Sequence, residues 1–429
     1  MSRASPLARR ALWAYGALGL PLAFAALPIY VHVPKLYGDS LGLSLALVGA
    51  VLLGTRLLDA FIDPLLGLWS DRIAHRRALI AAACPLMLAG VLALLNPIAW
   101  QDEWHGALWL AASLTAVYVG YSVASINYYA WGAEISTEPH ERTRITAARE
   151  GLSLVGVITA AALPGFLATD LPQGLARLSG VFAGVLAVFA AITLWAAPRA
   201  VLVPSPHPGG VAMLREVWAD RRFCALLLVF AVNGIASAIP ATLVLFFISD
   251  VLHLAARADL FLVLYFVAGA LALPLWVSVS RRLGKSTTWC VAMGLSVAVF
   301  AWAGFLGAGD LWQFAIICAA SGVALGADLA LPPSILADII EGGNEGEAAQ
   351  ARSGAYFGVW NFVTKLNLAL AAGVALPLLQ FAGYTPGQAG GEGALILAYA
   401  CAPLVLKLLA AALLWRHRST FIHQGSLSC

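Results

Sequence analysis

Two carboxylates stand four residues apart inside a long apolar stretch, where a charge is costly and usually functional. If this stretch is helical, Asp59 and Asp63 share one face, about one turn apart. Two neighbouring carboxylates in a low-dielectric setting cannot both stay ionised without a partner. They must share a proton, hold a cation, or pair with Arg56 or Lys365. A cation-coupled carrier needs such a pocket, and the alternative is a buried salt bridge with Arg56 that only holds helices together.

The elements that carry these residues are predicted to cross a membrane. Of the 429 residues, 61% are hydrophobic and 11% are charged, against about 45–50% and about 25% in soluble chains. The fold class is therefore an all-α membrane protein, and the lipid bilayer is a partner. The net charge of +3 gives no reason to expect nucleic acid. Windows of about 20 apolar residues predict twelve transmembrane helices, near 12–32, 41–69, 78–97, 108–133, 146–168, 177–197, 223–249, 258–280, 287–306, 311–340, 353–382 and 394–415.

The predicted helices fall into two groups of six around a longer polar connection. This arrangement is typical of carriers built from two parallel repeats. We predict an N-terminal six-helix bundle at 1–198, a cytoplasmic connecting loop at 199–221 and a C-terminal six-helix bundle at 222–429.

The repeat also acts as an internal control for the two aspartates. Span four ends with Glu134 where span ten ends with Asp338, each between Ala and Ile. In the same alignment Asp59 corresponds to Gly269 of span eight, and Asp63 corresponds to Leu273. The fold does not need carboxylates at this level, so another requirement retains them in the first half.

Basic residues predict the orientation in the membrane. Lys and Arg are enriched on the cytoplasmic side of membrane proteins. With both termini in the cytoplasm, the outer loops contain only Lys35, Arg177 and Arg257, and the inner segments contain most of the others. We expect a multi-pass protein of the inner (plasma) membrane with cytoplasmic N- and C-termini.

Around the two aspartates the sequence resembles a known family. The stretch from Arg56 to Gly67, Arg-Leu-Leu-Asp-Ala-Phe-Ile-Asp-Pro-Leu-Leu-Gly, resembles the span-two signature of the glycoside–pentoside–hexuronide:cation symporters. These form the melibiose-permease-like, sodium:galactoside symporter branch of the major facilitator superfamily. The Gly354-Ala-Tyr-Phe-Gly358 segment that leads to Lys365 resembles the same branch. The resemblance implies the major facilitator fold, with a substrate cavity between the two halves.

The resemblance also implies roles for individual residues. Asp59, Asp63 and Ser122 would bind the cation, and Lys365 would approach the acidic pair, with Arg56 as a second charge partner. Arg149, Trp360 and Asn361 would lie at or near the substrate cavity.

Two departures from the family pattern bear on substrate and coupling ion. Pro21 and Ser125 stand where galactoside-binding members have aspartates, so the usual grip on sugar hydroxyls is missing. Ile62 stands where the family often has Asn before the second aspartate. Hard cations prefer several oxygen ligands, whereas a proton needs only a carboxylate. A proton is therefore favoured over Na⁺, although Na⁺ at Asp59 and Asp63 stays an alternative.

Other polar and aromatic residues lie at the depth expected for a cavity. Ser125, Tyr128 and Tyr129 of span four could stack on a ring or line an apolar tail, although membrane aromatics are often only interface anchors. Arg149 has a substrate role, or Arg149 and Glu150 simply pair with each other or with Arg144.

Three further predictions concern spans five, ten and twelve. Asp328 of span ten is a candidate for a polar network and for substrate binding. Lys407 is expected to extend to the membrane interface without a role. Gly151, Gly156 and Gly165 are expected to permit close helix packing.

A polar segment follows span two. It runs from Gly67 to Arg77 and resembles the superfamily's cytoplasmic loop motif. Its charges either serve orientation alone or form an inter-helix latch that breaks when the carrier reopens. We predict a cytoplasmic gate made of Gly67, Asp71, Arg72, Arg76 and Arg77.

Together these features predict a secondary active transporter and not an enzyme. The intramembrane acids and hydroxyls lack a partnered His or Cys, so a nucleophile–base pair is missing. We expect symport of a proton or Na⁺ with a small organic solute, such as a sugar or glycoside, by a monomer without a cofactor. The alternative is a carrier of a lysolipid or another amphipathic molecule.

Overall fold

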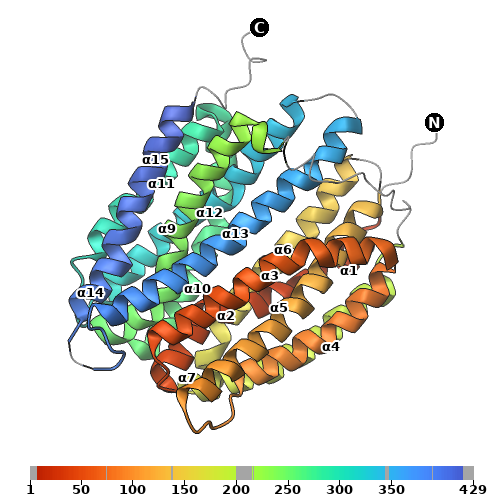
Figure 1. Ribbon diagram of the computed structural model, residues 1–429. Coiled ribbons are helices and arrows are strands. Elements are labelled where there is room, and N and C mark those ends of the chain that lie inside the picture. The colour runs from red at the N-terminus through yellow and green to blue at the C-terminus, as the bar shows by residue number, and fades with distance from the viewer. Residues whose placement is uncertain are drawn as a thin grey trace. The chain divides into compact units, whose positions relative to one another are not determined.

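The computed structural model describes residues 7–73, 75–136, 139–199, 215, 217–343, 347–388 and 390–418. The chain divides into two compact units, Met1–Pro206 and His207–Cys429 (Figure 1). Within the described residues, twelve helical segments are long and apolar enough to cross a membrane. This confirms the predicted all-α membrane fold of two six-helix bundles. Most of the predicted connecting loop, residues 200–214 and 216, lies outside the described residues.

The first unit holds six spans, coloured from red to yellow in Figure 1. Its first span is broken after Gly16, so two helices and a short π-helical turn share one membrane crossing. The elements are α1 (Arg9–Gly16), α2 (Gly19–Lys35), η1 (Leu36–Ser40), α3 (Leu45–Ile73), α4 (Arg76–Leu95), α5 (Glu103–Glu134), α6 (Pro139–Leu167) and α7 (Leu171–Ala196).

The second unit repeats this plan, coloured from green to blue. Its core packs around residues such as Phe223, Trp289 and Leu336, all fully buried. The elements are α9 (Arg221–Phe246), η2 (Phe247–Val251), η3 (Ala255–Arg257), α10 (Ala258–Leu283), α11 (Lys285–Ala303), α12 (Leu311–Gly343), α13 (Glu347–Phe381), α14 (Glu392–Ile396), η4 (Leu397–Cys401) and α15 (Ala402–His417).

Glycines bring the first and fifth spans into close contact. A Cβ atom at Gly16 would lie 2.8 Å from the carbonyl oxygen of Ala148, and one at Gly156 would collide with that of Leu20. Gly156 therefore confirms the predicted close packing, here between α6 and α2. A Cβ atom at Gly151 would meet nothing within 4 Å, so the prediction is wrong for Gly151, which lies away from the contact. This packing fixes the backbone beside Arg149.

Aspartates begin several spans by capping their helices. The Asp102 carboxylate accepts a hydrogen bond from the His105 backbone N–H at 2.9 Å, before α5. This bond, together with one from the His105 side chain, lowers the pKa of Asp102. Asp170 caps α7 and Asp220 caps α9 in the same way. A side-chain oxygen satisfies amide groups that a helix start leaves without an intrahelical acceptor.

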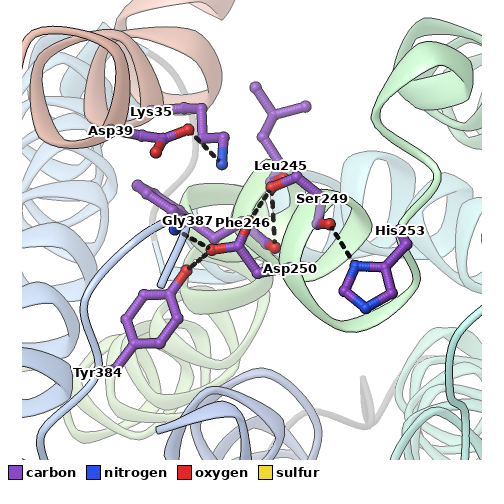
Figure 2. A network of polar contacts seen from close by, with 9 residues as sticks. All are labelled: Lys35, Asp39, Leu245, Phe246, Ser249, Asp250, His253, Tyr384 and Gly387. Atoms are coloured by element: carbon purple, nitrogen blue, oxygen red, sulfur yellow. Dashed lines mark hydrogen bonds and ion pairs between the residues drawn. The ribbon is translucent and has the colours of Figure 1, made fainter. Parts of the chain in front are cut away.

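The first spans of both units end in the same backbone turn. Leu41 N donates to Leu36 O at 3.0 Å, and Leu252 N donates to Phe247 O at 3.1 Å. Each turn places an aspartate at its fourth position. In the second unit, Asp250 accepts hydrogen bonds from the Tyr384 hydroxyl at 2.6 Å and the Gly387 amide at 3.0 Å (Figure 2). In the first unit, Asp39 pairs with Lys35 at 2.7 Å. Such π-helical turns often mark functional positions.

Candidate functional site

A buried carboxylate–hydroxyl contact joins α3 to α5. Asp59 is 4% exposed and Ser122 is 1% exposed. The Ser122 hydroxyl donates to Asp59 Oδ1 at 2.8 Å. The structure thus brings together two of the three residues predicted to bind the cation, although 63 positions separate them in the sequence.

Arg56 approaches the other oxygen of Asp59 from one turn earlier on α3. Its Nη1 lies 3.5 Å from Asp59 Oδ2, which is longer than the about 2.7–2.9 Å of a good charge-assisted hydrogen bond. The same guanidinium lies 4.5 Å from the ring centre of Tyr118, in a cation–π contact. Arg56 therefore contacts both a carboxylate and a ring. Asp63 is partly buried one turn further along α3.

Lys365 lies in the second unit, on α13, where it is partly buried. Its predicted approach to the acidic pair of the first unit stays a prediction.

Four polar and aromatic residues form one stripe along α5. Tyr118, Ser122, Ser125 and Tyr129 are separated by four, three and four residues, which places them on one face of a helix. The separation of seven positions between Ser122 and Tyr129 corresponds to about 10 Å along the axis. Asp59 contacts one part of this stripe and Arg149 contacts its end. An acidic group and a cationic group therefore contact the same face of α5 about two turns apart.

Arg149 of α6 occupies the end of the stripe. Its guanidinium carbon lies 4.2 Å from the ring centre of Tyr129. Its Nη2 lies 2.6 Å from Glu150 Oε1, whereas Arg144 pairs with Glu141. Of the pairings considered from the sequence, the structure shows the one between Arg149 and Glu150. The Arg149 side chain is 18% exposed and that of Glu150 is 62% exposed.

Tyr128 and Tyr129 are adjacent in sequence but have different surroundings. Tyr129 is 41% exposed, whereas Tyr128 is fully buried. The hydroxyl of Tyr128 donates to the Tyr15 carbonyl at 2.7 Å, and that of Tyr15 donates to the Tyr128 carbonyl at 2.9 Å. These reciprocal bonds hold α1 against α5. Ser125 is also buried, and its hydroxyl donates to the Ser122 carbonyl at 3.3 Å.

A polar network lies in the core of the second unit around Asp328. Lys407 Nζ is 2.8 Å from Asp328 Oδ2, and the Trp289 indole donates to Oδ1 at 2.7 Å. Asn233 donates its amide to the same carboxylate at 3.0 Å and accepts from Lys407 at 2.7 Å. The predicted polar network at Asp328 is confirmed, and its substrate role stays a prediction.

The expectation for Lys407 was wrong. The residue is 2% exposed and does not extend to the membrane interface. A carboxylate on α12 holds its ammonium group inside the bundle, at a position 79 residues away in the sequence.

The two substrate candidates on α13 also differ in their surroundings. Trp360 is 6% exposed, and its ring stacks on Phe230 of α9 with 3.7 Å between the ring centres. Asn361 is exposed. Trp360 therefore packs α13 against α9, and Asn361 is the more accessible of the two.

The predicted cytoplasmic gate is partly visible. Arg76 is 7% exposed, and it donates to Glu134 of α5 and to Ser70 of α3. Arg77 donates to the Ala197 carbonyl at 2.7 Å. Gly67 has open space at its Cβ position. The side chains of Asp71 and Arg72 lie outside the described part of the chain. Arg76 thus links three helices of the first unit, whereas opening of the gate stays a prediction.

Sequence reasoning missed several residues that complete these sites. Tyr118 was not singled out, although its spacing from Ser122 and Ser125 marks the same helix face. Trp289 and Asn233 carry no sequence signal, because only packing brings them to Asp328. Glu150 was considered only as a pairing partner.

Comparisons with known proteins agree with this architecture. The family described as MFS/sugar transport protein matches residues 12–420. The uncharacterized symporter YjmB of Bacillus subtilis (strain 168) is 23% identical over 410 residues, covering 90% of this chain and 87% of that protein. The glucuronide carrier protein homolog of Escherichia coli (strain K12) is 24% identical over 412 residues, covering 88% and 86%.

Solved structures show the same fold. The crystal structure of a D-xylose-proton symporter matches with a TM-score of 0.68 at 12% identity, covering 95% of this chain and 96% of that one. This match supports the major facilitator fold.

Proposed function

This chain belongs to the MFS/sugar transport protein family, and we propose that it is a secondary active symporter for a small polar organic solute. It is a multi-pass membrane protein and a transporter, not an enzyme. The finer proposal is that a proton or Na⁺ drives uptake of a sugar, a glycoside or a related compound. A relative named as a glucuronide carrier homolog supports this substrate class.

The buried Asp59 carboxylate carries the proposal. It accepts a hydrogen bond from Ser122 at 2.8 Å, and Arg56 lies 3.5 Å from its other oxygen. A buried carboxylate and a hydroxyl from another helix thus offer oxygen atoms at the position where the family resemblance puts the cation.

Coupling follows from the cost of moving a buried charge. A cation at the acidic pair neutralises it, so the loaded carrier reorients more easily than the empty, charged one. Cation and substrate that favour the same conformation must each raise the other's affinity. Alternating access would then move both together across the membrane.

A proton is the favoured coupling ion. Ile62 supplies no oxygen beside Asp63, so Asp59, Asp63 and Ser122 are the chief candidate ligands. Three oxygen-bearing residues provide few ligands for Na⁺, which prefers several coordinating oxygens, whereas protonation needs only a carboxylate. Calorimetry in buffers of different ionisation enthalpy, with Na⁺ or choline, separates the ions. Buffer-dependent heat that is indifferent to Na⁺ supports the proton, and affinity that rises several-fold with Na⁺ refutes it.

The central test replaces each carboxylate by its amide. Asp59→Asn and Asp63→Asn are expected to abolish uphill accumulation in energised vesicles, because a neutral amide cannot exchange charge with the cation. Expression and thermal stability should stay near wild type. Leu273→Asn, at the position of span eight that corresponds to Asp63, serves as the control for a polar amide at this level. Full uphill uptake by both aspartate variants would refute the coupling role.

A substrate screen distinguishes the amphipathic alternative. Purified protein is tested by thermal shift against sugars, glycosides, organic acids and lysolipids at two pH values. Stabilisation by lysolipids alone would favour the carrier of amphipathic molecules.

We also propose that both termini face the cytoplasm of a cell with this protein in its inner membrane. Single cysteines near residue 140 and within 205–212 should react only with membrane-permeant reagents, and one near Trp104 should react from outside. External labelling within 205–212 would mean that a span has been miscounted.

A further inference from the structure

We infer that Glu150 is an internal counter-ion for Arg149, which the anionic group of the substrate displaces. This inference rests on the proposed function. It assigns the substrate class as a polar organic anion carrying a carboxylate or sulfonate. It also makes Glu150 a residue that sets specificity.

The geometry of the Arg149–Glu150 pair is poor for a permanent ion pair. Neighbouring residues on a helix do not face each other, so both side chains must bend around α6 to meet. Arg149 Nε and Nη2 both donate to the single oxygen Oε1, at 3.1 and 2.6 Å. A guanidinium fork is best matched by two oxygens in its plane. Glu150 therefore leaves unused a two-oxygen mode that a free carboxylate or sulfonate can adopt.

The two partners also differ in their exposure. Arg149 is 18% exposed and lies against the Tyr129 ring, whereas Glu150 is 62% exposed. An exposed ion pair contributes little because water and salt compete with it. The arrangement therefore keeps Arg149 neutralised when no substrate is bound, and its counter-ion is easy to replace.

The backbone at Arg149 packs closely against α2, so the guanidinium is preorganised for a ligand. The Arg149 carbonyl oxygen would lie 2.8 Å from a Cβ atom at Gly19, which shows how closely α2 approaches. The Tyr129 ring, 41% exposed, supports the guanidinium and offers a surface to an incoming molecule. A preorganised cation loses less freedom on binding.

Glu141 and Arg144 provide a matched comparison on the same helix. They are three residues apart and pair at 2.6 Å, with Glu141 only 12% exposed. Glu141 also accepts from the Leu7 amide. Its two oxygens are therefore engaged in holding structure, and a ligand has no reason to displace it.

Binding to the purified full-length protein tests the inference without a gradient. The probes are D-glucuronate and 2-hydroxyethanesulfonate, with D-glucose and ethylene glycol as their neutral counterparts. Glu150→Gln should tighten binding of the anions by about two- to fivefold, because removal of an exposed counter-ion gives up only a weak pair. Binding of the neutral probes should not change. The gain should vanish in the Arg149→Gln/Glu150→Gln double variant, and Glu141→Gln should show no gain.

Two outcomes overturn the inference. One is the absence of any gain for both anions in Glu150→Gln. The other is an equal gain for the neutral probes or in the double variant, which would show that Arg149 is not responsible. Because all variants are compared at the same pH and Na⁺ concentration and without a gradient, the comparison does not depend on uphill uptake. If Asp59→Asn and Asp63→Asn keep uphill uptake, the proposed coupling fails while the Glu150 result stands.

Discussion

Replacing Lys407 by Met should destabilise the second unit strongly. The substitution keeps the length of the side chain but removes the ammonium group from the Asp328 network. Asp328, whose side chain is 14% exposed, then keeps its charge without a cationic partner. The Asn233 side-chain oxygen also loses its donor at 2.7 Å.

The magnitude follows from these losses. Removing one partner of a buried ion pair costs about 3–5 kcal/mol. Asp328→Leu should cost a similar amount, because it strands the Lys407 ammonium and the Trp289 indole N–H. The double variant removes both charges and leaves only neutral groups unsatisfied, at about 1–3 kcal/mol each. The double variant should therefore cost several kcal/mol less than the sum of the single variants.

Reversible unfolding in mixed micelles, followed by far-ultraviolet circular dichroism, gives the free energies for this double-mutant cycle. Lys285→Met is a comparison, since its pair with Asp338 is 34% and 41% exposed and should contribute about 1 kcal/mol or less. If the Lys407 and Asp328 effects simply add, or if Lys407→Met costs no more than Lys285→Met, the network does not act as a buried charge pair.

Further substitutions test the packing and the outer turn. Gly156→Ala should lower the free energy of unfolding by about 1–3 kcal/mol and weaken substrate binding, because the added Cβ would collide with the Leu20 backbone. Gly151→Ala, where the Cβ position is open, should not lower stability. Equal effects of the two variants in thermal unfolding would contradict this account. Asp250→Asn should speed amide hydrogen exchange at Gly387 by about tenfold, because the amide's charged acceptor becomes neutral, a change of about 1.4 kcal/mol. Unchanged exchange at Gly387 would show that other contacts hold this loop.

The fold could largely be predicted from the sequence, because a bilayer imposes a simple rule on the chain. Each crossing needs about 20 apolar residues with its backbone bonds satisfied internally. Hydropathy therefore located all twelve spans that the described residues contain. Local spacing was equally reliable for residues on one helix. The four-residue interval between Asp59 and Asp63 and the motif around them identified the acidic pair, and Ser122 followed from the family resemblance.

Hydropathy and residue spacing could not predict which side chains pair between different helices. Tyr128 and Tyr129 look equivalent in the sequence, yet one is locked against Tyr15 and the other is exposed. The sequence predicts that Lys407 extends to the membrane interface, whereas in the structure α12 places the Asp328 carboxylate beside its ammonium group. The partner of a side chain depends on how its helix is rotated and how closely the neighbouring helix approaches. A small residue such as Gly156 permits a close approach, but the sequence does not say which helix makes it. The sequence thus determined which residues enter the membrane, and tertiary packing decided which charges meet there, because neutralising a buried charge requires atoms from distant helices within about 3 Å.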